Sequence, residues 1–203
     1  NVFVIAKWGK RAADAIRAGM DLLAPPLGGQ GTATDLALTT AGVLRDSIRR
    51  GQRGLQQASD IFRVVPLGVG SVDDRIGVPL ARVYVTAAEI RDMLEILSLA
   101  HELKGTSYFP FLSGLRFRYN RYRLPLDRVF EIEMGDDVAG YTPLDLSAGN
   151  TRLYSLGLSI YLLKFVGLVE ELSQGLLSVR PKDAQGAPSR APDDTRASGW
   201  ISD

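Results

Sequence analysis

Apolar residues recur at helical spacing in two long stretches of the chain and in one short stretch. The first long stretch spans residues 9–24 and predicts a helix that ends before Pro25. Its apolar positions are Ala12, Ile16, Met20 and Leu23. Residues 159–172 are strongly apolar and predict a second helix, whereas residues 43–50 predict only one or two helical turns.

A further helix is marked by the residues at its two ends. Thr86 and Glu89 form the Thr-x-x-Glu pattern of a capping box, in which each side chain accepts a hydrogen bond from the other residue's backbone N–H. We expect the helix to run to about Lys104 and to stop at Gly105, because glycine is the residue that most often ends a helix.

Shorter apolar or alternating runs predict strands between these helices. We expect strands at residues 35–39, 80–85, 115–119, 129–134, 153–158 and 176–180, and an extended segment at residues 61–66. Helices and strands are mixed without a regular βαβ alternation, which predicts an α+β fold, a mixed β-sheet flanked by helices. Because the end of the chain is rich in Pro, Gly, Ala and Asp, we divide it into a domain at residues 1–182 and a polar C-terminal tail at residues 183–203.

The composition agrees with a globular α+β domain and excludes some classes of partner. The 203 residues are 45% hydrophobic and carry a net charge of +1, which is typical of a globular domain without a general attraction for nucleic acid. No apolar run reaches the roughly 18 residues that a membrane span requires. The chain does not begin with Met, and we expect it to be a piece of a longer protein.

Cysteine is absent and histidine occurs once, as His101, so few catalytic groups are available. Without cysteine there is no thiolate nucleophile and no cysteine metal site. Hydrolytic two-metal sites usually draw on several His and Asp ligands, and such a site is therefore not expected here. His101 lies near the end of a predicted helix with no nucleophile beside it, which favours a structural role. We expect the isolated chain to be inactive as an enzyme.

The most informative stretch runs from residue 35 to residue 68. A predicted strand leads into a turn at Ala41 and Gly42, and Arg45 follows at the start of the predicted helical turns. Such a turn exposes backbone N–H groups, and an arginine beside it can bind an anion or the polar edge of a ligand. The same pattern is also typical of an ordinary surface turn with a solvated arginine.

The order of motifs in and after this stretch resembles the C-terminal domain of the 5′-nucleotidase and UDP-sugar hydrolase family. Asp-Leu-Ala-Leu-x-x-Ala-Gly-x-x-Arg-x-x-Ile-x-x-Gly is followed by Asp-Ile-Phe-x-Val-x-Pro-Leu-Gly. Ser113-Gly114-Leu115 and the segment at residues 154–163 continue the resemblance, which covers residues 9–182. It implies a substrate-recognition domain of a metal-dependent phosphoesterase whose catalytic metallophosphatase domain is not in this chain.

The resemblance assigns site residues one by one. In the family an Arg after the glycine turn contacts the nucleoside, and Arg45 matches it, with Gly42 in the turn. Thr40 stands where the family has an Asn before that turn. Leu67 stands where the family often has an aromatic that stacks on the base, and Tyr161 matches the second aromatic. Since Leu67 offers no aromatic face, half of the nucleoside clamp is expected to be absent.

The resemblance also implies partners, cofactors and a location. The expected partners are a nucleotide-like small molecule and the protein's own N-terminal metallophosphatase domain, with no nucleic acid. No cofactor is expected in this chain, because the family's Asp-x-His, Gly-Asn-His-Asp/Glu and Gly-His-x-His elements do not occur. Divalent metals are expected in the N-terminal domain. The location implied is periplasmic or extracellular.

Two other interpretations remain open. A degenerate member of the family could keep the fold and only dock a partner or another domain. Alternatively, residues 116–123, in which arginines alternate with aromatics, could bind single-stranded nucleic acid. On a strand the arginines would share one face, and Phe117 and Tyr119 the other. We therefore favour a solvated face and a packed face over a nucleic-acid site.

Overall fold

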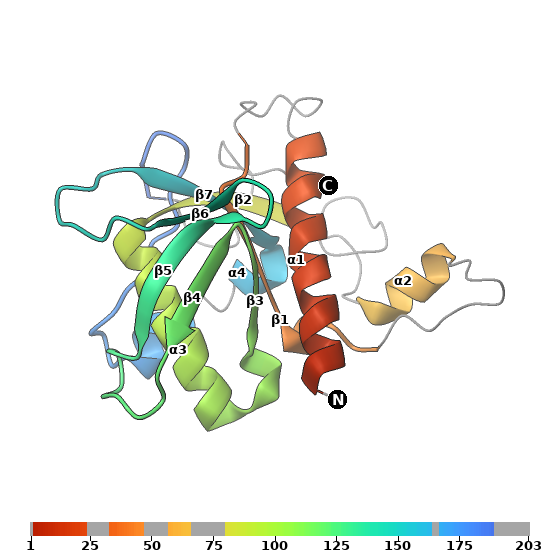
Figure 1. Cartoon of the computed structure of the whole chain (residues 1–203), viewed down its shortest axis with the longest axis horizontal. Helices are drawn as coiled ribbons and strands as arrows, with labels where there is room; N and C mark the ends of the chain where they lie inside the picture. The colour runs from red at the N-terminus through yellow and green to blue at the C-terminus, as the bar shows by residue number, and fades with distance from the viewer. Residues whose placement is uncertain (1, 24–32, 47–56, 66–79, 164–166, 189–203) are drawn as a thin grey trace.

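The computed structural model describes residues 2–23, 33–46, 57–65, 80–163 and 167–188 (Figure 1). The helices, strands and short 3₁₀ helices (η) of this part of the chain are, in order, α1 (Val2–Leu23), β1 (Leu36–Thr40), η1 (Ala41–Val43), α2 (Ala58–Val64), β2 (Leu80–Thr86), α3 (Ala87–Lys104), η3 (Thr106–Tyr108), β3 (Pro110–Ser113), β4 (Leu115–Tyr119), β5 (Val129–Asp136), β6 (Gly140–Pro143), β7 (Leu153–Ser159), α4 (Ile160–Leu163) and α5 (Gly167–Leu172). The predicted α+β fold is confirmed.

A mixed four-stranded sheet with the order β2-β7-β1-β3 forms the centre of the domain. β7 comes late in the chain but lies between β2 and β1. It pairs antiparallel with β2 along its whole length and parallel with β1, where Leu36 lies opposite Leu156. All five residues of β1 are buried, as expected for an inner strand that is covered on both faces.

α1 covers one face of this sheet and runs along one side of the domain (Figure 1). Gly157 of β7 faces this helix, and a Cβ added there would lie 3.1 Å from Met20. Gly9 of α1 lies against the ring of Phe111 on β3, and a Cβ added to Gly9 would collide with that ring. Glycine at these two positions therefore lets the helix approach the sheet closely.

The opposite face of the sheet carries the main hydrophobic core. Leu156 and Leu158 flank Gly157 along β7, so they point away from α1 and toward α3. They belong to a large cluster of buried side chains that also includes Ile90 and Met93 of α3 and Leu163 of α4. The central sheet is thus held between α1 on one face and α3, with the short α4 and α5, on the other.

A second sheet, with the order β4-β5-β6, continues directly from the first. The chain leaves β3 through Gly114, whose φ is +79° and whose added Cβ would collide with the carbonyl oxygen of Asp35. Only glycine fits this position, which explains the Ser-Gly-Leu motif in physical terms. Glu95 of α3 joins the helix to the second sheet, because its Oε1 accepts a hydrogen bond of 2.6 Å from the backbone N–H of Val129.

Both predicted ends of α3 are confirmed. Thr86 Oγ1 accepts from the N–H of Glu89 at 3.3 Å, and Glu89 Oε2 accepts from the N–H of Thr86 at 2.8 Å. The helix ends at Lys104, and Gly105 caps it with a φ of +102°. Lys182 also donates to both carboxylate oxygens of Glu89 at 2.6 Å, so the last part of the domain is tied to the start of this helix.

The prediction of an extended segment at residues 61–66 is wrong for residues 61–64, which are helical. Residue 66 lies outside the described residues. Residues 58–64 form α2, because Gln57 and Asp60 make a capping box at its start. The helical turn predicted at residues 43–50 is also misplaced. It begins earlier, as η1, and Leu44 after it is extended, so Arg45 follows a turn and does not start a helix. Residues 47–50 lie outside the described residues.

The strand predicted at residues 176–180 is likewise wrong, although the structure describes all of these residues. Gln174 and Gly175 have positive φ, which turns the chain sharply after α5. Ser173 Oγ then accepts from the N–H of Leu177 at 2.9 Å. The isolated bridges that follow, Tyr84 with Lys182 and Lys182 with Pro188, include none of residues 176–180. The predicted helix at residues 159–172 is represented by α4 and α5, and residues 164–166 lie outside the described residues. None of the described helices has the length and hydropathy that crossing a membrane requires.

Replacing Thr86 by Ala should destabilise the domain, because it removes the side-chain acceptor of the capping box. We expect a loss of about 1 kcal/mol in the free energy of unfolding, which corresponds to a drop of about 2–4 °C in the thermal midpoint. Urea denaturation followed by circular dichroism measures the change. The control is Thr151→Ala at an exposed position outside any helix. Equal midpoints for the two variants would contradict the role of the cap.

Glu95 should make stability depend on pH in a direction opposite to that of an ordinary surface carboxylate. Burial raises its pKa above 4.5, although hydrogen bonds from the backbone N–H groups of Val129 and Arg128 oppose that rise. Between pH 4.5 and the raised pKa of Glu95, the folded state therefore binds more protons than the unfolded state. As a result, the contribution of Glu95 to stability falls as the pH rises through its folded pKa. Glu95→Gln keeps an acceptor oxygen and removes the charge.

We therefore expect the unfolding free energy of Glu95→Gln, relative to the wild type, to increase from pH 4.5 to about pH 8. Urea unfolding at several pH values measures this difference. Glu170→Gln, at an exposed position, is the matched control and should show a smaller change. A difference that is constant with pH would show that Glu95 carries no raised pKa.

Candidate functional site

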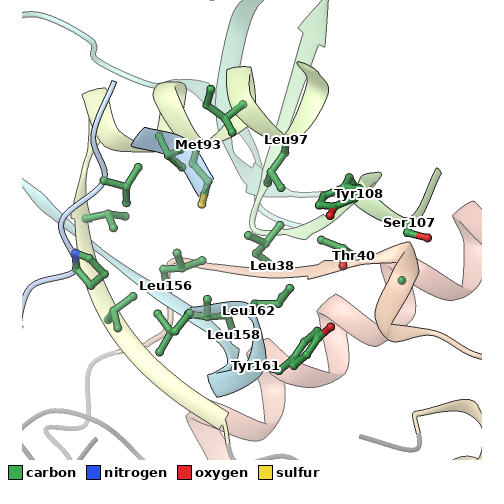
Figure 2. A pocket seen from close by; sticks show the side chains of 18 of the residues that line it. Leu38, Thr40, Met93, Leu97, Ser107, Tyr108, Leu156, Leu158, Tyr161 and Leu162 are labelled. Atoms are coloured by element: carbon green, nitrogen blue, oxygen red, sulfur yellow. The ribbon is translucent and has the colours of Figure 1, made fainter. Parts of the chain in front are cut away.

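A cavity of about 200 Å³ lies on the α3 side of the main sheet. Side chains from β1, β2 and β7 form its floor, and residues of α3, α4, α5, η1 and η3 form its walls (Figure 2). Among the described residues of its lining, Arg45 alone carries a charge. The cavity therefore combines one cation with a mostly apolar surface, which is the usual composition of a small-molecule site.

The polar residues of this cavity gather at one end. They are Thr40, Arg45, Ser107, Tyr108 and Tyr161, and Gly42 lies among them in the chain turn after β1. Figure 2 shows Thr40, Ser107 and Tyr108 on one side of the view, and Leu156 on the other side. We call the first group, with Gly42, Arg45 and Tyr161, the polar end of the cavity.

Strand directions explain why residues so distant in sequence meet at the polar end. β1 and β7 are parallel neighbours, so both strands end at the same edge of the sheet. Thr40 is the last residue of β1, and Tyr161 lies two residues after Ser159, the last residue of β7. β3 is antiparallel to β1, and Pro110 at its start pairs with Thr40, which brings the preceding η3 to that edge as well.

Gly42 shapes the polar end by allowing two short 3₁₀ helices to touch. A Cβ added to Gly42 would lie 3.0 Å from the carbonyl oxygen of Ser107, so a larger residue would push η1 away from η3. The N–H of Ala41 also donates to the carbonyl of Phe109 at 3.0 Å. Ser107 and Tyr108 are thereby held beside Thr40.

Arg45 is held by its backbone, while its side chain is exposed. Its N–H donates to the carbonyl oxygen of Val64, the last residue of α2, at 2.8 Å. The next residue, Asp46, forms an ion pair of 3.1 Å with Arg63 of the same helix. These two contacts fix the chain direction at Arg45, which lines the cavity.

Tyr161 lies at the start of α4 and is 37% exposed. The hydroxyl of Ser159 accepts a hydrogen bond from the N–H of Leu162 at 3.4 Å, which holds the first turn of α4 against the end of β7. Leu162 and Leu163 are buried on one side of the helix. Tyr161 is therefore presented at the cavity with part of its ring accessible.

Four of the five site residues expected from the sequence surround one cavity: Thr40, Gly42, Arg45 and Tyr161. Leu67 lies outside the described residues. Sequence reasoning missed Ser107 and Tyr108, which directly follow the helix stop at Gly105. A tyrosine between a helix stop and the Ser-Gly-Leu motif was a usable signal, but its place depends on β3, a strand that the sequence pattern did not predict.

The arginine-rich residues 116–123 have a different environment from this cavity. Arg118 pairs with Glu131 at 3.2 Å across the strands, and Arg116 pairs with Glu133 on the same side of the sheet. The predicted alternation is wrong at Tyr119, which is 40% exposed and not packed. The register shift between Arg116 and Arg118 places its extra residue on β5, so it does not interrupt the alternation along β4, and Tyr119 is exposed as the last residue of the strand.

No metal-binding cluster of three or more His, Cys, Asp or Glu side chains occurs among the residues that the structure describes. The ring of His101 packs edge-to-face against Phe109, with 5.1 Å between the ring centroids. Its carbonyl oxygen accepts from the N–H of Gly105 at the end of α3. His101 thus contributes to the packing and the capping of this helix end.

Comparison with solved structures shows the same fold in two larger proteins. The 5′-nucleotidase precursor from Thermus thermophilus is 23% identical, with a TM-score of 0.58 over 89% of this chain. The NAD nucleotidase (NadN) of Haemophilus influenzae is 17% identical, with a TM-score of 0.54 over 78% of this chain. The matched region covers only 30% of the Thermus protein and 26% of the Haemophilus protein.

Comparison of the sequence itself gives the family. No curated protein sequence matches the chain significantly. The profile of the family described as "5′-nucleotidase, C-terminal domain" matches residues 6–151, which is more than half of the chain. The chain therefore belongs to the 5′-nucleotidase family, as its C-terminal domain.

Proposed function

We propose that this domain recognises the nucleoside-like part of a substrate on behalf of a phosphoesterase whose chemistry resides on a separate N-terminal domain. The single observation that carries the proposal is the polar end of the cavity. There, residues from the ends of β1 and β7 meet although more than a hundred residues of sequence separate them. A cavity at the carboxyl ends of parallel strands is a common position for ligands.

Two tyrosines offer aromatic surface to a planar group. In the view of Figure 2, Tyr161 and Tyr108 lie on opposite sides of Thr40. Stacking on one aromatic ring contributes about 1–3 kcal/mol per base. We propose that Tyr161 stacks on the planar group and that Tyr108 supplies the second aromatic surface, which the family motif would place at Leu67. Arg45 and Thr40 then donate hydrogen bonds to the polar edge of the ligand.

The catalytic step is proposed for a domain outside this chain. Hydrolysis of a phosphate ester by two metals requires several His and Asp ligands around a nucleophilic water. The sequence contains one histidine. We therefore propose that divalent metals bind to an N-terminal metallophosphatase domain, and that the present domain positions the substrate against it. A periplasmic or extracellular location and a role in nucleotide breakdown are proposed on the family resemblance alone.

A role limited to docking a partner is less well supported. A docking-only domain would need no cavity, and closer packing of the core would be more stable. Instead, Tyr161 is 37% exposed and lines the same cavity as Arg45. The concave and mostly apolar cavity that Tyr161 lines favours binding of a small molecule.

The isolated chain should bind adenosine weakly through Tyr161. We expect a dissociation constant of about 1 mM, or about −4 kcal/mol. Tyr161→Ala should weaken binding about fivefold or more, because it removes at least about 1 kcal/mol of stacking. Isothermal titration calorimetry measures both values. The matched control is Tyr122→Ala in the turn after β4, where the side chain is 90% exposed. Equal affinities for the two variants would remove Tyr161 from the site.

The isolated chain should release no phosphate from AMP, with or without Mn²⁺, Mg²⁺ or Zn²⁺. The reason is the absence from its sequence of the histidines that a two-metal site needs. A colorimetric phosphate assay measures release against a blank without protein. A longer form of the protein that includes the N-terminal domain should be active under the same conditions. Metal-dependent turnover by the pure 203-residue chain would contradict the proposal.

A further inference from the structure

The cavity does not end at its polar residues but continues into the hydrophobic core. Beyond Thr40 its surface is formed by Leu38 and Leu156 of the sheet and by Met93 and Leu97 of α3 (Figure 2). Val83 and Leu158 also line this inner part. All of these side chains are aliphatic or thioether groups, and none of them can donate or accept a strong hydrogen bond.

The aliphatic inner part of the cavity is expected to stay dry and to bind apolar groups. An apolar cavity of about 150 Å³ takes up benzene, which has six carbons. At the same volume per carbon, the whole cavity of about 200 Å³, its polar end included, has room for about eight carbons in all. The inner lining contains no aromatic ring, so a flexible aliphatic chain fits it better than a planar base. A nucleoside alone would leave this inner volume empty.

We propose that the cavity binds a small amphiphile of about eight carbons in all, with an aliphatic chain and an anionic or hydrogen-bond-accepting end group. The chain lies between the main sheet and α3, and the end group lies at the polar end beside Arg45. This inference rests on the proposed function and deepens it. The substrate class of the recognition site is a molecule with an aliphatic substituent, which accounts for the weak binding expected of a bare nucleoside.

Linear n-alkyl carboxylates from butanoate to decanoate test the proposal without any variant. Each methylene buried in the cavity should lower the dissociation constant about fourfold. The gain should stop at about eight carbons, when the cavity is full. Calorimetric titration of the 203-residue chain measures the series below micelle-forming concentrations. No binding at any length, or affinity that rises evenly through decanoate as in surface adsorption, would overturn the proposal.

Two variants of α3 locate the aliphatic chain. Leu97 is half-buried and lines the inner cavity, whereas Leu103 of the same helix is 68% exposed and does not line it. Leu97→Phe should fill part of the cavity and weaken octanoate binding about tenfold or more, with a smaller effect on butanoate. Leu103→Phe should leave the series unchanged. Equal effects of the two substitutions would place the carboxylates outside the cavity and overturn the proposal.

Arg45→Gln locates the end group. It should weaken octanoate binding about tenfold, because a charge-assisted hydrogen bond is lost, and should leave 1-octanol binding nearly unchanged. An equal loss for octanoate and 1-octanol would contradict the placement beside Arg45.

Adenosine, titrated in parallel, separates this inference from the proposed function. If adenosine binds through Tyr161 and no carboxylate binds, the inference fails and the proposed function stands. If neither binds, both fail. If the carboxylates bind with the chain-length limit and adenosine does not, the inference holds. The nucleoside part of the proposed function then fails.

Discussion

The parallel pairing of β1 with β7 is the constraint on which the site depends. It brings the last residue of β1 and the first turn after β7 to one edge of the sheet, with Leu36 opposite Leu156. A slip of one residue would turn the side chains of β7 to the opposite face. Leu156 and Leu158 would then face α1, and Gly157 would face the cavity. The floor of the cavity and the close approach of α1 would be lost together.

Polar contacts at the other end of these strands hold this register. The carboxylate of Asp35, just before β1, accepts from the N–H of Ser155 at 2.8 Å and from Arg152 at 2.9 Å. The hydroxyl of Ser155 in turn accepts from the N–H of Asp35 at 2.8 Å. Since Ser155 is almost fully buried, breaking this exchange would leave unpaired polar groups in the sheet, which is costly. The contacts that fix the site therefore lie at the opposite edge from it.

The sequence predicted those parts of the fold whose signals are local. The capping box at Thr86 and the helix stop at Gly105 are read from neighbouring residues, and the structure has both. β3 was not predicted because it is short and begins at a proline, and its pairing with β1 is a tertiary contact. Residues 176–180 look like a strand, but Gln174 and Gly175 turn the chain so that only Lys182 reaches β2.

The same distinction applies to the candidate site. Thr40, Gly42, Arg45 and Tyr161 were named through the order of family motifs, and the structure places them around one cavity. That they meet there follows from strand directions, which no local pattern encodes. Ser107 and Tyr108 were missed because their place depends on the unpredicted β3. The aliphatic inner part of the cavity was also beyond reach, since its residues carry the ordinary pattern of a buried core.

The central claim is that the edge formed by the ends of β1 and β7 is where a ligand binds. An NMR titration of the isotope-labelled chain with adenosine tests it most directly, because every backbone amide reports on its own surroundings. The account predicts that the largest chemical-shift changes occur at residues 40–45, 107–108 and 160–163, and that the amides of β4 and β5 change little. Changes centred on residues 116–123, or no saturable change at any amide, would contradict it.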